Sequence, residues 1–430
     1  MNKLCAYFQI HQPHRLRRMR VFDIGARLSC DGRAERVADM PGDAVSTDHW
    51  FDDDLDHRVL ARVVERCYRP ATRTLLLHAR RYGPQFRVAF GVTSTVLAQL
   101  ERHAPDVLDN LGELVASGSA EVLGETSHHS LAWLVDVDEF AAQVEEHRDA
   151  VRRRFGVTPA VFRNTEMLFD DGLAAWLAGR GYRAVLAEGA DRLLGGRSAT
   201  SIYKAAPAAR LRVLLRHYRL SDDVGFRIDH ADGGRPLAAA TWVQWVAAAG
   251  GQSVNVFLDF ETFGEHQGTA SMKLLEELPD ALAAAGVAMH LPSEAAALAA
   301  DDSISARGIV SWADESRDES AWLGNSMQRS ATARLYALLP AVRETGDRRV
   351  LEAWRRLATS DHAYYMSTKG FGDGEVHAHF RPYESPYEAH LNFMNVLADL
   401  KLRLTGKRGQ VHLKKLNEFV PQKFAASSPP

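Results

Sequence analysis

The chain has 430 residues, of which 46% are apolar, and its 52 basic and 55 acidic residues give a formal charge of −3. Because the two signs are mixed along the sequence, no extended positive field favours nucleic acid or an anionic membrane as a partner. The length and the apolar content predict a globular protein with one large core and a smaller second domain.

The three cysteines are Cys5, Cys30 and Cys67, which have no metal-ligand spacing and leave one thiol unpaired in any disulfide scheme. This usage is typical of a reducing compartment, so we expect a cytoplasmic protein. The first apolar run stops at His11, too early for a signal peptide. No run approaches the roughly 20 apolar residues of a membrane span, and the sequence leaves the oligomeric state open.

Short apolar runs rich in β-forming residues predict seven strands. They cover residues 4–10, 86–90, 120–123, 160–163, 184–187, 213–215 and 254–260. Helical patterns separate them, for example at residues 138–148, where Asp138 can cap the first turn and Gly156 marks the end of the segment. Strands that alternate with helices predict parallel βα units.

Two segments depart from this rhythm. Residues 17–56 have little periodicity and many charges, which predicts a long excursion over the mouth of a cleft. After about residue 298, helical patterns at 320–339, 348–360 and 386–405 predict a C-terminal helical domain. We therefore expect one domain at 1–300, a helical domain at 301–424 and a disordered tail at 425–430.

Polar side chains gather where the predicted strands end. They are His11, Gln12, His14, Glu121, Glu125, His128, His129, Arg163, Glu166, Asp259, Glu261 and His266. Asp259 follows a buried run directly, and Glu261 lies on the same face because strand side chains alternate. Since parallel strands deliver their carboxyl ends to one active face, we expect these groups to converge.

Two carboxylates on a rigid rim, here Glu166 and Asp259, suit glycoside hydrolysis. In that reaction one group attacks the sugar or activates water, and the other protonates the leaving oxygen. The strand-end histidines also supply ligand types for a metal-dependent hydrolase, although no His-Glu-x-x-His helix occurs. Neither a Gly-x-Ser-x-Gly elbow nor a Gly-rich phosphate loop is present.

Four motifs in order resemble those of glycoside hydrolase family 57, and within it the α-amylase-like branch. They are FQIHQPH at residues 8–14, GSAEVLGE at 118–125, RNTE at 163–166 and DFETFG at 259–264. The resemblance implies an incomplete (β/α)7 barrel at 1–300, followed by a C-terminal α-helical bundle. It also implies a retaining mechanism on α-1,4-glucans such as maltodextrin, starch or glycogen, with no catalytic metal and no cofactor.

Residue by residue, the resemblance implies that Glu166 is the nucleophile and Asp259 the acid/base, with His11 and Glu121 lining the subsite at the cleavage point. Many family members have a Trp where this chain has Arg163, and the change removes an aromatic platform from that subsite. Aromatic rings next to Asp259 would favour its neutral form by desolvation, as a proton donor requires.

Further residues are expected to contact the α-glucan. They are His14, Arg163, His129, Glu261, His266, Trp312, Asp361 and His362. The fifth family motif is diffuse, and both Trp312-Ala313-Asp314 and Ser360-Asp361-His362 are candidates for it. His377, His379, Tyr364 and Tyr383 add groups that can stack on or hydrogen-bond to sugars.

The chemistry leaves several activities open. The family that the motifs resemble includes branching enzymes, glucanotransferases and galactosidases, so transfer on the same site is an alternative to hydrolysis. A metal-dependent polysaccharide deacetylase would use the strand-end histidines. A non-catalytic glucan-binding protein would keep the architecture without turnover, although the presence of both Glu166 and Asp259 argues against it.

Overall fold

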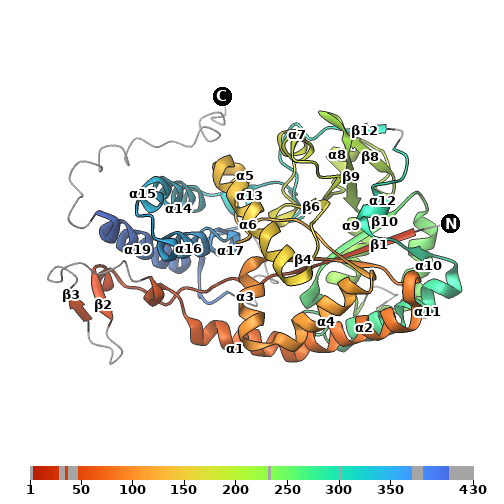
Figure 1. Ribbon diagram of the computed structural model, residues 1–430, viewed down its shortest axis with the longest axis horizontal. Coiled ribbons are helices and arrows are strands. Elements are labelled where there is room, and N and C mark those ends of the chain that lie inside the picture. Colours follow the sequence, from red (N-terminus) through yellow and green to blue (C-terminus); the bar gives the residue numbers. More distant parts are fainter. Residues whose placement is uncertain are drawn as a thin grey trace. The chain divides into compact units, whose positions relative to one another are not determined.

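A computed structural model describes residues 3–28, 34–36, 47–230, 234–300, 302–369 and 381–405 (Figure 1). Cys30, His377, His379 and the tail predicted at 425–430 lie outside the described residues. The chain folds into two compact units. Unit 1 comprises Met1–Gln12, Val59–Ser127 and Gln143–Glu319, and unit 2 comprises Pro13–Arg58, His128–Ala142 and Ser320–Pro430. The domain limits expected from the sequence, at residues 300 and 424, stay a prediction.

Unit 1 contains two five-stranded sheets. The first consists of β1 (Lys3–Ile10), β4 (Val88–Val92), β5 (Ala120–Val122), β10 (Val254–Asp259) and β11 (Ala288–Met289). Its order is β10-β1-β4-β5, with β11 paired to the start of β1, and all these pairs are parallel. The central strand β1 is buried along almost its whole length, as expected of a strand covered on both faces.

The second sheet has the order β12-β8-β9-β7-β6. It consists of β6 (Val161–Arg163), β7 (Ala184–Glu188), β8 (Ile202–Ala205), β9 (Ala208–Arg216) and β12 (Asp302–Ile304). All its pairs are parallel except β8 with β9, a hairpin whose turn contains Pro207. The sequence predicted only parallel βα units, so the antiparallel β8–β9 hairpin was not predicted.

Backbone hydrogen bonds connect the two sheets. Gly124 N donates to Val161 O at 2.9 Å, and Arg163 N donates to Gly124 O at 2.8 Å, which links β5 to β6. His217 N, just after β9, donates to Asn255 O of β10 at 2.8 Å. The seven strands predicted from the sequence therefore follow one another in the order β10-β1-β4-β5-β6-β7-β9.

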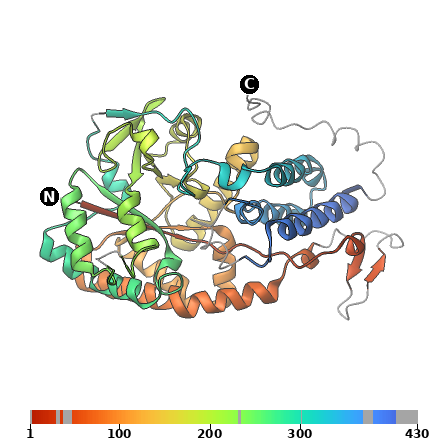
Figure 2. The same ribbon diagram turned by 180° about the vertical axis from the view of Figure 1, so that it is seen from behind.

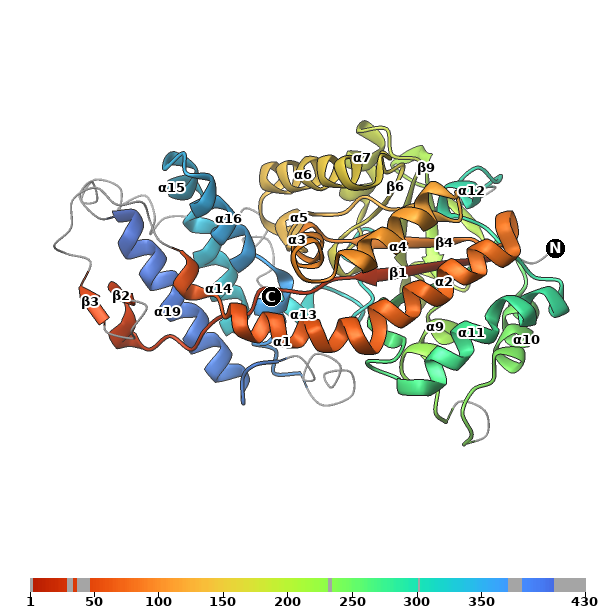
Figure 3. The ribbon, with the colours of Figure 1, turned by 60° about the horizontal axis from the view of Figure 1, so that its bottom comes forward.

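Helices cover the strands of unit 1. They are α2 (Arg69–Tyr82), α3 (Ser94–His103), α4 (Pro105–Ala116), α7 (Asp171–Gly179), α8 (Asp191–Leu194), α9 (Tyr218–Gly225), α10 (Ala239–Ala249), α11 (Gly268–Ala285) and α12 (Pro292–Ala295). Helices α4, α2, α11 and α10 pack in a row, which Figure 3 shows most clearly. Two helices, α1 (Asp53–Val63) and α6 (Val137–Phe155), contribute residues to both units. As predicted, α6 ends just before Gly156, which has φ +70°.

Short helical turns place several side chains of interest. They are η1 (Val21–Asp23), η3 (Asp48–Trp50), η4 (Val64–Tyr68), η5 (Gly83–Gln85), η6 (Thr165–Met167) and η7 (Phe260–Thr262). η4 is a π-helical turn between α1 and α2, a feature that is frequent at functional sites. Its Cys67 thiol donates to Phe260 O at 3.0 Å, so this turn packs directly against η7.

Unit 2 is mainly helical in its described part. Its elements include α5 (Ala132–Val135), α13 (Ser320–Leu323), α14 (Ser326–Ala337), α15 (Leu339–Glu344), α16 (Arg348–Leu357), α17 (Ser360–Tyr364), α19 (Pro386–Thr405) and the antiparallel pair β2 (Ala26–Leu28) and β3 (Ala34–Arg36). Helix α14 packs against α13, α15, α17 and α19, and Figure 2 shows these blue helices from behind. The helix predicted at 386–405 is confirmed, whereas the one at 320–339 is divided at Gly324, where Asn325 caps α14.

Residues 17–56 were expected to form one irregular excursion. In the described part they contain η1, the β2–β3 pair, η3 and the start of α1, all within unit 2. No helix in the described part of the chain has both the length and the apolar character needed to cross a membrane.

Candidate active site

The site in unit 1 is built on β1, the central strand of the first sheet. Tyr7 and Gln9 alternate with apolar residues, so both side chains lie on the same face. In the parallel register Gln9 is level with Asp259 on β10 and with Gly91 on β4. A Cβ atom at Gly91 would lie 2.2 Å from the Tyr7 hydroxyl and 2.6 Å from Gln9 Oε1, so only glycine leaves room for these two polar side chains.

The Tyr7 hydroxyl donates a hydrogen bond to Gln9 Oε1, and the charges of four other side chains act on it. The pKa of Tyr7 is raised well above its usual value, mainly by burial, and the positive charge of Arg163 opposes that rise. The negative charges of Glu125, Asp259 and Glu166 raise the pKa further. One cation and three carboxylates, carried near the carboxyl ends of β5, β6 and β10, therefore act on the same buried hydroxyl.

Glu166 has a strained backbone. It lies in η6 directly after β6, is buried, and has φ 54° and ψ 25°, in the left-handed region that side chains other than Gly rarely adopt. Met167 follows with φ 52°. Such conformations cost about 1–3 kcal/mol each and are concentrated at active sites, where surrounding contacts hold them in place.

Trp312 supplies one of those contacts. Its indole Nε1 donates to Glu166 Oε2 at 2.6 Å, and its backbone N donates to Glu166 O at 3.3 Å. The chain just before Trp312 is also paired with the chain after Glu166, because Phe169 and Val310 exchange two backbone hydrogen bonds of 2.8 and 2.9 Å. One oxygen of the Glu166 carboxylate is therefore held by a directed donor.

Arg163 is completely buried, and its guanidinium carbon lies 4.6 Å from the centre of the Trp312 ring. No hydrogen-bond partner from the described residues reaches any of its three guanidinium nitrogens. A buried guanidinium in this position acts mainly through its charge and through the cation–π contact. The resemblance predicted the loss of an aromatic platform here, and the ring of Trp312 lies against the arginine instead.

Asp259 is the last residue of β10 and is half-buried. The next residue, Phe260, lies in an aromatic cluster with Phe8, Phe90 and Phe263, with ring centroids 5.7 to 6.0 Å apart. This cluster anchors the end of the strand, and it leaves Asp259 as the polar group at that end, level with Gln9.

Glu261 is buried in η7 two residues after Asp259. Its Oε1 accepts hydrogen bonds from Gln12 Nε2 at 3.2 Å and from the Tyr68 hydroxyl. Burial, reinforced by the negative charge of Asp259, raises the pKa of Glu261 to about 8, even though the Tyr68 bond favours the anion. Glu261 is therefore mostly protonated at neutral pH.

The two glutamates of the second motif lie in different places. Glu121, in the middle of β5, accepts a 2.9 Å hydrogen bond from Ser293 N in α12, and burial raises its pKa. Glu125 lies three residues after the end of β5 and accepts from Gln9 Nε2 at 3.1 and 3.4 Å. His147 lies beneath it, with Nε2 3.8 Å from Glu125 Oε1. The structure thus brings Glu125, and not Glu121, into the group around Tyr7.

Two expected histidines belong to unit 1. His11 follows β1 directly, and its Nδ1 is 2.9 Å from the hydroxyl of Thr93, which caps α3. His266 is half-buried after η7, and its backbone N donates to Glu261 O at 2.9 Å. Both are positioned by the ends of the strands that carry Gln9 and Asp259.

The other expected residues belong to unit 2. His14 Nδ1 lies 3.0 Å from Asp56 Oδ2. Burial lowers the pKa of His362 to about 4, and the charges of Asp361, Asp56 and His14 also act on this histidine. His129 has φ 50°, and its carbonyl accepts from Ser360 N at 2.9 Å. The described aromatic residues Tyr364 and Tyr383 are buried.

Sequence reasoning did not select several residues of the site in unit 1. They are Tyr7, Gln9 and Tyr68. Gln12 and Glu125 were among the strand-end polar groups, but neither was assigned to the substrate. The sequence does contain a signal for Gln9, which interrupts an apolar strand with an amide. No sequence signal connects Tyr68 with Glu261.

Comparison with known proteins gives the family. The model for glycosyl hydrolase family 57 matches residues 7–311. A Methanocaldococcus jannaschii protein named "Putative alpha-amylase" is 32% identical over 415 residues, which cover 92% of this chain and 83% of that protein.

Two solved structures share the fold. The branching enzyme of this family from Pyrococcus horikoshii has a TM-score of 0.62 and 14% identity, covering 100% of this chain and 98% of that one. The 4-α-glucanotransferase from Thermococcus litoralis has a TM-score of 0.57 and 15% identity, and the match covers 93% of this chain but 60% of that longer one. The family model and the M. jannaschii relative together show that the chain belongs to glycosyl hydrolase family 57.

Proposed function

We propose that the protein hydrolyses α-1,4-glucans by a retaining, double-displacement mechanism, with Glu166 as nucleophile and Asp259 as general acid/base. The observation that carries the proposal is the convergence of these two carboxylates around Tyr7, at the carboxyl ends of β6 and β10. The strained backbone of Glu166 and the directed bond from Trp312 support its role as the attacking group.

In the first step Oε1 of Glu166 attacks the anomeric carbon while Asp259 gives its proton to the glycosidic oxygen. The bond to the leaving sugar breaks as the ester to Glu166 forms. In the second step the Asp259 carboxylate takes a proton from water, which attacks the same carbon and releases Glu166. Two inversions at one carbon retain the configuration.

In this proposal the residues next to Glu166 and Asp259 support the two catalytic carboxylates and bind the sugar. Arg163 balances the negative charge of Glu125, Glu166 and Asp259, which lowers the cost of holding several carboxylates in a buried space. The Glu261 carboxyl, protonated near neutral pH, can donate to a sugar hydroxyl or accept from one. We place Glu125 with His11 at the cleavage subsite, and contact between the sugar and Glu121 stays a prediction.

We also propose that the seven strands form the incomplete (β/α)7 barrel expected of this family and that the helices of unit 2 form its C-terminal bundle. The support is the strand order β10-β1-β4-β5-β6-β7-β9. In addition, the backbone hydrogen bond from His217, just after β9, to Asn255 on β10 joins the first and last strands of that order. His14, His129, Asp361 and His362 are proposed as further substrate contacts, and the cytoplasmic location expected from the cysteines stays a proposal.

The same site can pass the glucosyl ester to a sugar hydroxyl in place of water, which would make the enzyme a transferase. The 32% identical relative carries an α-amylase name, which favours hydrolysis. The deciding experiment incubates the protein with maltoheptaose and separates the products by length over time. Hydrolysis gives only shorter chains with new reducing ends, whereas transfer also gives chains longer than the substrate.

Glu166→Gln serves as the inactive control in this experiment, because the neutral amide has nearly the same volume and cannot form the ester. A wild-type sample that leaves maltoheptaose, starch and glycogen unchanged would contradict the proposed activity.

A further inference from the structure

The loop that carries Trp312 is held at several points. Ser311 N donates to Arg317 O at 2.9 Å, and Ser311 Oγ donates to Asp318 O at 2.7 Å, which closes the loop on itself. Arg192 donates to Ser316 O at 2.7 Å and so fixes the outer part of the loop. The position of the indole therefore depends on groups outside the site described above.

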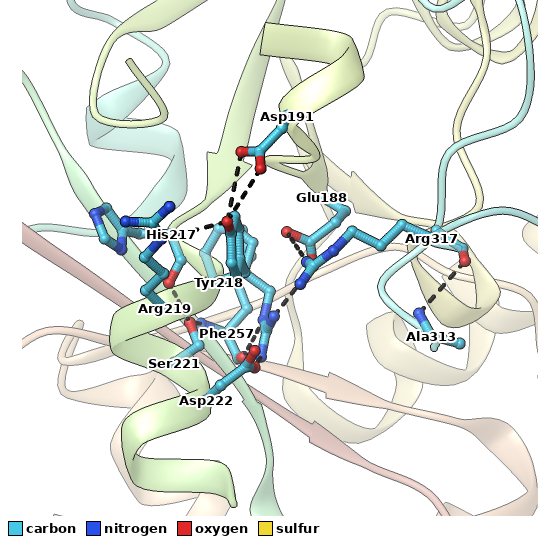
Figure 4. A network of polar contacts seen from close by, with 12 residues as sticks. Glu188, Asp191, His217, Tyr218, Arg219, Ser221, Asp222, Phe257, Ala313 and Arg317 are labelled. Atoms are coloured by element: carbon cyan, nitrogen blue, oxygen red, sulfur yellow. Dashed lines mark hydrogen bonds and ion pairs between the residues drawn. The ribbon is translucent and has the colours of Figure 1, made fainter. Parts of the chain in front are cut away.

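Arg317 connects this loop to the end of β7. Its Nη1 lies 3.2 Å from Oε1 of Glu188, the last residue of that strand, as Figure 4 shows. Its guanidinium also stacks on the Tyr218 ring at 3.9 Å, and the Tyr218 hydroxyl donates to Asp191. Arg317 has φ 50°, so these contacts hold a strained backbone.

Glu188 is completely buried and lies between two arginines. Its Oε2 accepts from Arg216 at 3.1 Å, and Arg216 also reaches Asp222 at 2.6 Å and Phe257 O at 2.9 Å. Burial raises the pKa of Glu188 to about 7, against the lowering effect of the two arginines. A buried carboxylate of this kind is stable only while both partners stay in place.

Arg216 also contacts the indole. Its guanidinium carbon lies 5.7 Å from the centre of the Trp312 ring, and that of Arg163 lies 4.6 Å from the same centre. The ring is therefore fixed by two buried cations, one of which is bound to Glu188. A continuous set of contacts leads from Glu188 through Arg216 and Arg317 to Trp312.

We propose that Glu188, Arg216 and Arg317 form a positioning network that holds the Trp312 indole N–H on Oε2 of Glu166. Its catalytic consequence rests on the proposed function of Glu166 as the nucleophile. The network keeps Glu166 ionised and aims its other oxygen at the sugar, because a donor on one carboxylate oxygen favours the anion and fixes the plane of the group. None of the three network residues touches the substrate.

The first measurement is the pH profile of kcat/KM, whose acidic limb reports the ionisation of the nucleophile in the free enzyme. Trp312→Phe removes the donor and is expected to move this limb upward by about one pH unit. Arg317→Met is expected to move the acidic limb in the same direction by a smaller amount. Arg317→Lys keeps a cation near Glu188, so its acidic limb is expected to lie close to the wild-type position.

The matched control is Arg227→Met, which removes an exposed arginine that is paired with Asp223 of α9. It is expected to leave the limb in place. An acidic limb that stays at its wild-type position in both Trp312→Phe and Arg317→Met would overturn the proposal, whatever happens to the overall rate.

The second measurement needs no turnover. Carboxyl ¹³C signals of labelled glutamates are titrated by NMR, and the Glu166 signal is identified by its loss in Glu166→Gln. Its pKa is expected to rise in Trp312→Phe and Arg317→Met and to be unchanged in Arg227→Met. If the wild-type protein cleaves no glucan, the proposed function fails, but this titration still tests the positioning network. An unchanged pKa of Glu166 in Trp312→Phe would overturn the network proposal. This result is decisive even if Arg317→Met does not fold.

Discussion

Gln9 donates its side-chain amide to both carboxylate oxygens of Glu125, at 3.1 and 3.4 Å. This contact joins the central strand to the second sequence motif at the level of Asp259. Glu121, the glutamate that the family resemblance selected, faces the same side of its strand four residues earlier, about 13 Å away along an extended chain. The contact therefore favours Glu125 over Glu121 as the glutamate of the second motif that belongs to the site.

We predict that Glu125→Gln lowers kcat/KM on maltodextrin by about 10²-fold or more, because the variant removes a negative charge that acts on Tyr7 together with those of Glu166 and Asp259. Glu121→Gln is the matched change and is expected to cost less, since its carboxylate binds Ser293 N in α12. Steady-state kinetics of the two variants decide the matter. A larger loss in Glu121→Gln would restore the original assignment.

Asp259→Asn should separate the acid role from general disruption. The variant cannot protonate a leaving sugar, so we expect turnover of maltodextrin to fall by about 10³-fold or more, while an activated aryl glycoside retains much more of its first-step rate. Burst kinetics with the aryl substrate check this. Equal losses on both substrates would mean that Asp259 is not the proton donor.

Glu261 should make stability fall as pH rises. Its pKa is about 8 in the folded state and near 4.5 in the unfolded chain, so between these values the folded state holds a proton that the unfolded state has released. The free energy of unfolding should then fall by at most about 1.4 kcal/mol per pH unit in that window.

Glu261→Gln should remove this part of the slope, because the amide does not titrate and can still accept from Gln12 and Tyr68. Urea unfolding of both proteins between pH 5 and pH 8 gives the comparison. The same slope in the variant would assign the titration to another group.

Removal of metals should leave the activity unchanged, because the proposed mechanism uses only the two carboxylates. The measurement is the rate on maltodextrin after exhaustive dialysis against EDTA, with and without added Zn²⁺. A loss that zinc restores would favour the deacetylase alternative, in which strand-end histidines bind a metal.

Seven of the strands described in unit 1 were predictable because most of them are buried parallel strands, and such strands form apolar runs in the sequence. The strands β8, β11 and β12 were missed. β8 reads Ile202-Tyr203-Lys204-Ala205, too short and too mixed to distinguish from a loop, and its partner across the hairpin begins with two alanines. Strand formation there depends on pairing, which a local pattern does not encode.

The positions of Glu166 and Asp259 near strand ends were predictable, since Asp259 ends an apolar run and Glu166 follows three residues after β6, whereas their catalytic roles stay a prediction. The choice between Glu121 and Glu125 was not, because both belong to the same short segment and only the hydrogen bonds from Gln9 show which of them lies beside the residue that is level with Asp259. The bond from Trp312 to Glu166 joins residues 146 apart in sequence, and the ion pair between Arg317 and Glu188 also joins residues that lie far apart in the chain.

The most direct test of the account is to trap the ester on Glu166. The protein is incubated with a 5-fluoro-α-glucosyl fluoride, which slows release of the intermediate, and is then digested with pepsin and sequenced by mass spectrometry. We predict one added fluoroglucosyl group, located on Glu166 and absent from Glu166→Gln. A label on a different carboxylate, or active enzyme that turns over maltodextrin with inverted configuration, would contradict the assignment of Glu166 as the nucleophile.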